Sequence, residues 1–267
     1  MTTLAHDAPL VRRATAAAPR LRRLNAAMAA LHLGQGVLVL VLATAFALPV
    51  TTAFLEVDDA GSTLLPTLET AFEVPIAPLV AAFLFLSAAA HLVLVLPRVH
   101  GWYTRSLGRG INPARWVEYS LSSTLMIVAI AMLVGVYDAA SLLLLAVANA
   151  TMILCGWLME LWNEGRERVR WGAFWVGCLA GAAPWAAIGL YLVGAGLGPG
   201  GPPGFVYAIY GSIFLFFNVF ALNMGLQYKR VGPWRDYLFG ERVYILLSLT
   251  AKSALAWQVF AGTLRPV

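Results

Sequence analysis

The last long apolar stretch of the chain reads Leu246-Leu247-Ser248-Leu249-Thr250-Ala251-Lys252-Ser253-Ala254-Leu255-Ala256-Trp257, and it carries a lysine, Lys252, in its middle. A lysine at the centre of a membrane-spanning helix costs about 2.5 to 3.5 kcal/mol on insertion scales. An ionisable residue at that depth indicates a functional site and needs a partner of opposite charge. The other charge well inside an apolar stretch is Glu118. One buried amine and one buried carboxylate therefore form the predicted centre of the protein.

The composition indicates a membrane protein. Of the 267 residues, 60% are apolar and 12% are charged, whereas a soluble domain carries about 25% charged residues. A spanning helix needs about 20 apolar residues. Seven runs of the sequence meet that length: 25–48, 76–97, 114–136, 139–161, 172–195, 205–227 and 242–263. The sequence thus predicts an all-α membrane protein, a seven-transmembrane-helix bundle that packs as one domain.

The parts outside the spans are short. Residues 1–24 are a basic N-terminal segment that leads into the first span and does not resemble a cleaved signal peptide. The bundle domain covers 25–263, and residues 264–267 are a C-terminal tail. The longest connection, 51–75, carries five acidic and no basic residues: Glu56, Asp58, Asp59, Glu69 and Glu73. We expect it to be a long extracellular loop.

Basic residues set the orientation of the bundle. Sixteen of the 18 flank one set of span ends: Arg12, Arg13, Arg20, Arg22, Arg23, Arg98, Arg105, Arg109, Arg115, Arg166, Arg168, Arg170, Lys229, Arg230, Arg235 and Arg242. The opposite set has Arg265 alone, and the remaining basic residue is Lys252. Because short cytoplasmic loops carry the excess of Lys and Arg, the N-terminus is predicted to be cytoplasmic and the C-terminus extracellular, in a multi-pass cell-membrane protein.

The same distribution weakens two other interpretations. The net charge of +5 does not indicate nucleic-acid binding, because the basic residues lie at the ends of apolar segments. The two cysteines, Cys155 and Cys178, lie inside apolar stretches and are expected to be small core residues. No disulfide or metal framework follows from them.

Three kinds of site are compatible with a buried Lys252 and Glu118. A purely structural ion pair contributes little net stability once desolvation is subtracted. A transporter ion site predicts broken helices and paired acids near mid-membrane, and neither is evident. A lysine amine in an apolar pocket is also a nucleophile toward an aldehyde. This third interpretation, a covalent cofactor with the carboxylate as its counter-ion, is the one we favour.

Side chains near the pair could line the pocket of a long polyene. Ser248 lies one helical turn before Lys252, where its hydroxyl could bond the nitrogen or the carboxylate. The expected lining is Tyr119, Ser122, Ser123, Met126, Met152, Trp175, Phe217 and Phe220. Small residues also favour close helix packing in membranes, which is the alternative for Ser122 and Ser123. Trp175, Phe217 and Phe220, like Tyr210 and Phe214, are by default ordinary membrane core.

Several polar residues predict a second, polar cavity beside Glu118. His32 and His91 lie in different spans, each on the half that is expected to hold Glu118, although a lone histidine is more often a core residue. Asn149 is a third polar group in an apolar span. Asn112 and Trp116 precede Glu118 by six and two residues, and we expect them to border the same cavity. Because Glu118 is early in its span and Lys252 is mid-span, either the lysine reaches toward the cytoplasm or this helix begins before Pro113.

Taken together these residues resemble a known family. Seven spans with a lysine in the seventh are similar to a retinal-binding rhodopsin. The inverted topology, the long first loop and two motifs resemble a heliorhodopsin over essentially the whole chain; the motifs are Arg115-Trp116-Val117-Glu118-Tyr119-Ser120 and Ser248-Leu249-Thr250-Ala251-Lys252-Ser253.

The resemblance implies all-trans retinal as cofactor, bound to Lys252 as a protonated Schiff base, with Glu118 as counter-ion and Ser248 near the nitrogen. It implies that the polar positions around the Schiff base are His32, His91, Ser87 and Asn149. It also implies a homodimer in the lipid bilayer, light sensing with a slow photocycle, and no pumping or enzyme activity.

The residues themselves also argue against a pump. A microbial pump has a donor carboxylate three turns after its acceptor, and the residue eleven positions after Glu118 is Ala129. Ser248 stands where a second counter-ion is usual. We expect one clear carboxylate in the interior, with Glu160 near the membrane edge. A light-driven ion pump or light-gated proton channel remains the main alternative, and a retinal-free enzyme or transporter the other.

The orientation gives a test. A cysteine introduced near residue 60 should react with an impermeant thiol reagent added to intact cells, because that loop is predicted to be extracellular. One introduced near residue 105 should not react. The reverse labelling pattern would contradict the predicted topology.

Overall fold

The computed structural model describes residues 8–57, 61 and 63–266. Residues 1–7 of the predicted N-terminal segment, Asp58 and Asp59 of the predicted acidic loop, and Val267 of the tail lie outside the described residues. Within this part of the chain, seven helices are long and apolar enough to cross a membrane. The prediction of an all-α seven-transmembrane fold is therefore confirmed.

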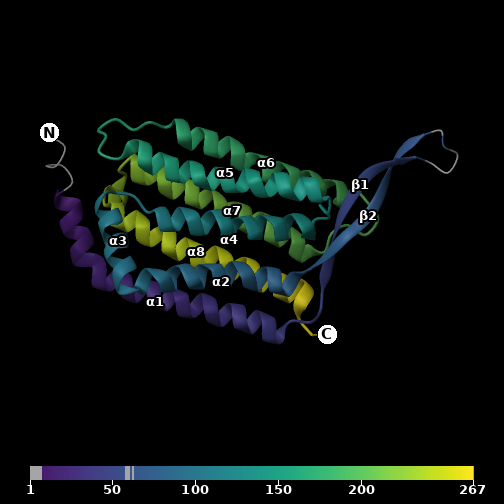
Figure 1. Ribbon diagram of the computed structural model, residues 1–267, viewed down its shortest axis with the longest axis horizontal. Coiled ribbons are helices and arrows are strands. Elements are labelled where there is room, and N and C mark those ends of the chain that lie inside the picture. The colour runs from purple at the N-terminus through teal and green to yellow at the C-terminus, as the bar shows by residue number, and fades with distance from the viewer. Residues whose placement is uncertain (1–7, 58–60, 62, 267) are drawn as a thin grey trace.

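The seven long helices run roughly along one axis, and a β-hairpin projects from one end of the bundle (Figure 1). The helices are α1 (Ala8–Leu42), α2 (Ile76–Val95), α4 (Pro113–Leu133), α5 (Ala139–Asn163), α6 (Gly172–Gly196), α7 (Gly204–Tyr228) and α8 (Tyr237–Val259). A π-helical turn, Phe260–Leu264, continues α8. We call the two ends of the bundle the hairpin end and the α3 end, after the short helix α3 (Pro97–Gly108) that lies at the opposite end.

The first helix differs from its predicted range, 25–48. It already includes Ala8 and ends at Leu42, because Ala14 and Leu21 on its early turns are buried against Tyr103 and Leu107 of α3. Packing on α3 extends the helix beyond the apolar run. Helix α3 was not predicted, because it lies in the connection between the second and third predicted spans.

The predicted long loop is an antiparallel hairpin. Strand β1 (Ala47–Val57) pairs with β2 (Leu64–Pro75), with a register shift between Val50 and Thr51. The β-branched run Val50-Thr51-Thr52 favours extended backbone over helix, in agreement with its place in β1. The Thr51 amide also donates to the Tyr137 carbonyl at 2.9 Å, so the base of the hairpin is tied to the segment before α5.

Two helix starts place the central residues. Helix α4 begins at Pro113, and the side chain of Asn112 caps it by accepting from the Arg115 amide. Helix α8 begins at Tyr237, earlier than the predicted 242, and the Asp236 side chain caps it. The main core cluster joins buried side chains of α2, α4, α6, α7 and α8 on the hairpin side of these starts.

Candidate functional site

Lys252 and Glu118 meet inside the bundle. Their side chains are 4% and 8% exposed, and the Lys252 Nζ donates to Glu118 Oε1 at 3.1 Å. The same amine donates to Ser248 Oγ at 2.7 Å, and Ser87 Oγ on α2 donates to Glu118 Oε1 at 2.5 Å. The buried amine is thus paired with a carboxylate that is itself hydrogen-bonded, which a buried ion pair requires.

The lysine reaches back along its own helix to make this contact. Because helical side chains lean toward the N-terminus of their helix, the Lys252 amine extends toward the α3 end, where Glu118 lies near the start of α4. The helix does not begin before Pro113. Tyr119 fixes the relation of the two helices, because its hydroxyl donates to the Tyr244 carbonyl of α8 at 2.8 Å. The Lys252 Nζ also lies 4.9 Å from the centre of the Tyr119 ring.

An apolar pocket between α4, α5, α6, α7 and α8 includes Lys252 in its lining. Of the expected lining residues, Tyr119, Ser123, Met126, Met152, Phe217, Phe220 and Ser248 line it together with Lys252. Gly177 lets α6 pack closely on α5, because a Cβ there would lie 3.0 Å from the Cβ of Cys155. The pocket therefore places one amine in a lining that is mostly apolar.

Two expected lining residues lie elsewhere. Trp175 is 66% exposed on the outer face of α6, and its neighbour Phe174 faces the pocket instead. Ser122 is buried but is not part of the lining. Successive side chains on a helix point in very different directions. A sequence rich in aromatic residues therefore does not show which aromatic side chain faces the interior of the bundle. Cys178, expected in the core, is likewise exposed.

A small polar cavity lies on the α3 side of the Lys252–Glu118 pair. Its lining includes Asn25, His91, Asn112 and Glu118. The His91 Nδ1 lies 2.7 Å from Asn25 Oδ1. His32 is buried and stacks on His91, with ring centres 5.8 Å apart. The two histidines and Asn112 therefore gather beside Glu118 as the sequence suggested.

Four residues expected in that cavity do not belong to its lining. Two of them adjoin it: Ser87 donates to Glu118, and His32 stacks on His91. The other two have partners elsewhere. Asn149 donates from α5 to Ser123 Oγ and Thr124 Oγ1, at 2.9 and 3.0 Å, and so ties α5 to α4. Trp116 lines the apolar pocket, and its Nε1 donates to Glu160 Oε2 at 2.6 Å. The polar side-chain groups of both residues are thus hydrogen-bonded to a neighbouring helix.

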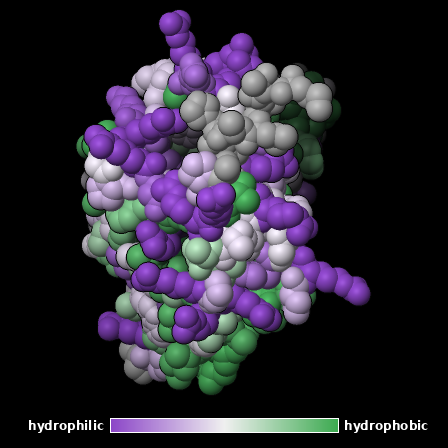
Figure 2. All heavy atoms as spheres, turned by 90° about the vertical axis from the view of Figure 1, so that its left-hand side faces the viewer, coloured by the Kyte–Doolittle hydropathy of each residue, from purple (hydrophilic) through white to green (hydrophobic). Residues whose placement is uncertain are grey.

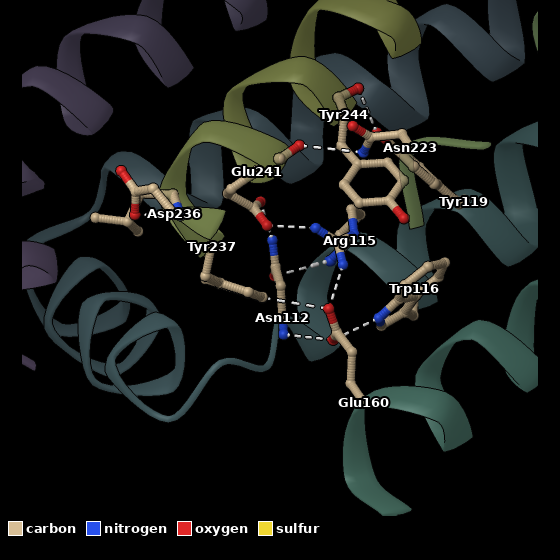
Figure 3. A network of polar contacts seen from close by, with 12 residues as sticks. Asn112, Arg115, Trp116, Tyr119, Glu160, Asn223, Asp236, Tyr237, Glu241 and Tyr244 are labelled. Atoms are coloured by element: carbon tan, nitrogen blue, oxygen red, sulfur yellow. Dashed lines mark hydrogen bonds and ion pairs between the residues drawn. The ribbon is translucent and has the colours of Figure 1, made fainter. Parts of the chain in front are cut away.

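The structure contains a charged cluster that the sequence analysis missed. Arg115, Glu160 and Glu241 are 6%, 3% and 1% exposed. The Arg115 guanidinium pairs with both carboxylates, through NH2 to Glu160 and through NH1 to Glu241 (Figure 3). It also lies over the rings of Trp116 and Tyr244, at 4.4 and 4.0 Å.

This cluster corrects the expectation of one interior carboxylate. Glu160 and Glu241 sit at the end of α5 and the start of α8, positions that hydropathy assigns to a membrane edge. There α3 and the early turns of α1 cover the bundle, so the edge of the apolar runs is not the edge of the protein. The usable signal was the Arg115 side chain, one turn before Glu118 on the same helix.

Beyond the cluster, the α3 end opens into a cleft of about 650 Å³. Glu160 and Tyr237 belong to its lining, and basic side chains surround them: Arg13, Arg109, Arg166, Lys229, Arg230 and Arg235. Figure 2 looks onto this end of the molecule and shows hydrophilic residues over much of it. Within the described residues, no group of three or more His, Cys, Asp or Glu side chains is arranged to hold a metal ion.

Comparison with known proteins agrees with this arrangement. A family model described as heliorhodopsin matches residues 21–264 of the chain. Opsin-1 of Neurospora crassa is 33% identical over 66 residues, which are 25% of this chain. That match spans 21% of the length of Opsin-1.

The charged cluster gives a stability prediction. Arg115→Gln should destabilise the folded protein by about 3 to 5 kcal/mol, because it leaves a buried carboxylate without its cation. The matched control is Arg109→Gln, which removes a cation that is 58% exposed and pairs with Glu164, and exposed pairs contribute about 0.2 to 1 kcal/mol. Unfolding in detergent, followed by tryptophan fluorescence, measures both. Equal losses of stability in the two variants would contradict the buried ion cluster.

Proposed function

Because this chain belongs to the heliorhodopsin family, we propose that it is a light-sensing photoreceptor that carries all-trans retinal on Lys252. The single observation that carries the proposal is the apolar pocket that Lys252 lines. Lys252 would hold retinal through its Nζ as a protonated Schiff base, with water released, and the bound cofactor would supply a polyene that absorbs visible light and isomerises. A purely structural ion pair would need no such pocket.

The residues of the pocket fit this cofactor. Its walls are mostly apolar, with a few polar side chains, as a polyene requires. We propose that Tyr119 and Met126 of α4 and Met152 of α5 contact the polyene of retinal. Phe217 and Phe220 of α7 are proposed to contact it as well. Ser248 is proposed to orient the Lys252 nitrogen, since the two are already hydrogen-bonded.

Glu118 is proposed to be the counter-ion. Its carboxylate is the one that contacts the Lys252 amine, at 3.1 Å, and Ser87 donates to the same oxygen. A fixed anion at this place keeps the nitrogen protonated and stabilises its charge most strongly in the ground state. Ser87, His91 and Asn112 are proposed to be polar positions around this pair, and His32 a neighbour through His91.

The absence of net pumping is proposed on the placement of polar groups. Glu118, His91, Asn112 and the polar cavity all lie on the α3 side of Lys252. On the hairpin side, the buried residues of α4 and α8 are apolar: Met126, Ile127, Ala129, Ile130, Met132, Leu255, Ala256 and Val259. Vectorial transport needs proton-binding groups on both sides. The interior holds Glu160 and Glu241 besides Glu118, so the number of buried carboxylates does not by itself exclude pumping.

A light-driven pump or light-gated proton channel is the second candidate, and the cluster of Arg115, Glu160 and Glu241 is the observation in its favour. These carboxylates lie near the α3 end, on the same side of Lys252 as the counter-ion. They support proton movement within one half of the protein and not across it. A role without retinal, as an enzyme or transporter, has no comparable support.

The orientation, parts and assembly of the chain are also proposed. The basic cleft at the α3 end favours a cytoplasmic α3 end and N-terminus. We retain the division into residues 1–24, 25–263 and 264–267, with the hairpin outside the cell. The hairpin exposes large apolar side chains, among them Phe54, Leu68 and Phe72 at 68%, 73% and 58%, and such patches mark interaction surfaces. This supports a homodimer in the lipid bilayer.

Lys252→Ala should form no visible pigment when all-trans retinal is supplied, because the amine that binds the aldehyde is missing. The measurement is an absorption spectrum with and without hydroxylamine. Lys229→Ala, which removes a lysine at the α3-end cleft, serves as the matched control and should keep its colour. A visible pigment in Lys252→Ala would show that another group binds retinal.

Glu118→Gln should shift absorption to the red, or deprotonate the nitrogen and move absorption to the ultraviolet. Excitation moves positive charge away from the Lys252 nitrogen, so a neighbouring anion stabilises the ground state more than the excited state. Two unit charges about 4 Å apart at an effective dielectric near 20 interact by roughly 4 kcal/mol. Spectra of both proteins over a pH series measure the effect. Wild-type colour and pH dependence in the variant would mean that another group is the counter-ion.

Illuminated cells that contain the protein should show no sustained, uncoupler-sensitive pH change in unbuffered salt solution. The apolar hairpin side offers no proton-binding group among the described residues of α4 and α8 named above. Cells with Lys252→Ala provide the baseline. A persistent shift that an uncoupler abolishes would favour the pump over the sensor.

A further inference from the structure

The charged cluster at the α3 end does not balance. Arg115 supplies one positive charge and Glu160 and Glu241 supply two carboxylates, all three in side chains that are at most 4% exposed. With both carboxylates ionised, the cluster holds one uncompensated negative charge away from water. Such a charge is costly enough that a buried group takes up a proton instead.

The hydrogen bonds distinguish the two carboxylates (Figure 3). Glu160 accepts from Arg115, from the Asn112 amide at 2.8 Å, from Trp116 at 2.6 Å and from the Tyr237 hydroxyl at 3.2 Å. Four donors on two oxygens stabilise the ionised form. Glu160 is therefore the anion that balances Arg115.

Glu241 accepts fewer hydrogen bonds than Glu160 and lines a different cavity. It accepts from Asn112 Nδ2 at 2.5 Å and from Arg115, which leaves lone pairs of its oxygens free for a proton. Its side chain also lines the polar cavity beside Glu118 and His91. Glu160 does not belong to that lining, and faces the outer cleft instead.

We propose that Glu241 is a proton-exchanging carboxyl, which holds a proton in the resting protein and exchanges it through the polar cavity with His91 and Glu118. The proton leaves a Glu241 oxygen and binds a free nitrogen or carboxylate of its partner, so one O–H bond breaks, one N–H or O–H bond forms, and no redox change is needed. Its link to events at Lys252 depends on the proposed function, whereas the proton on Glu241 does not.

Other titratable groups around Glu241 come from five helices. They are His91 on α2, Tyr103 on α3, Arg115, Glu118 and Tyr119 on α4, Glu160 on α5, and Tyr237 and Tyr244 on α8. Helix α1 contributes the uncharged Asn25. Arg115 is the cation of this set that contacts Glu241, and Glu160 already balances it. Lys252 is balanced by Glu118 in the same way. No cation in this set is left over to hold Glu241 ionised.

Infrared spectroscopy of the full-length, retinal-free protein at neutral pH tests the resting proton. The wild type should show a carboxylic-acid carbonyl band that moves in deuterium oxide, and Glu241→Gln should lose the band of one carboxyl group per chain. Glu164→Gln, at an exposed ion pair with Arg109, is the matched control and should keep it. Identical carboxylic-acid absorption in the wild type and Glu241→Gln would overturn the proposal.

A second variant tests whether the charge of Glu160 keeps Glu241 protonated, while the Glu241 side chain itself is unchanged. In Glu160→Gln, Arg115 has Glu241 as its remaining carboxylate, so Glu241 should ionise and its acid band should disappear although the residue is intact. Persistence of the band there would contradict the charge argument. Glu241→Gln mimics the neutral acid and should fold like the wild type; failure to fold would count against a neutral Glu241.

Illumination of the retinal-loaded protein tests the exchange. The Glu241 band should change in light-minus-dark spectra of the wild type, and this change should be absent from Glu241→Gln. A pigment whose Glu241 band is present in the dark and unaffected by light would overturn the exchange. If no pigment forms, the proposed function fails, while the dark spectra still decide whether Glu241 carries a proton.

Discussion

The cost of placing charge inside a membrane protein organises this structure. A lysine amine in the middle of α8 needs an anion, and the anion stands on α4, 3.1 Å away. This contact joins α4 to α8. Because Lys252 reaches toward the α3 end, the polar groups that satisfy its partner gather on that side: Ser87 on the carboxylate, then His91 and Asn25 around the cavity.

The same constraint acts again one turn earlier on α4. Arg115 is buried between two carboxylates and two aromatic rings. Helix α4 thus carries a cation at its start and an anion one turn later, and each is paired with the opposite charge on α8. Asn112, the cap of this helix, donates to both carboxylates of the outer cluster. A single short segment, 112–118, therefore sets the register of α4 against α5 and α8.

The result is a molecule with two unlike halves. From Lys252 to the α3 end, the interior holds ionisable groups in close succession, and the last of them borders an open, basic cleft. From Lys252 to the hairpin, the buried residues of α4 and α8 are apolar. Ionisable groups lie close together in the first half, whereas the buried residues of α4 and α8 in the second half offer none. This one-sidedness supports the proposal of a light sensor that does not pump ions.

The sequence by itself determined the number and type of the spans, because length and hydropathy are local properties of a run of residues. It also indicated that Lys252 and Glu118 pair, since an unpaired charge at that depth in a membrane is costly. Helical periodicity placed Ser248 within reach of Lys252. The family resemblance rested on the same residues, and the match over residues 21–264 confirms it.

Only the tertiary structure decided which residues at the span ends are buried. Arg115, Glu160 and Glu241 lie where hydropathy marks a membrane edge, and they are buried because α3 and the first turns of α1 close over that end. Tertiary packing likewise turned the predicted loop into a hairpin, moved Trp175 to the outer face, and gave Trp116 and Asn149 partners away from the polar cavity. Burial and partnership depend on what neighbouring elements cover, and no single stretch of sequence carries that information.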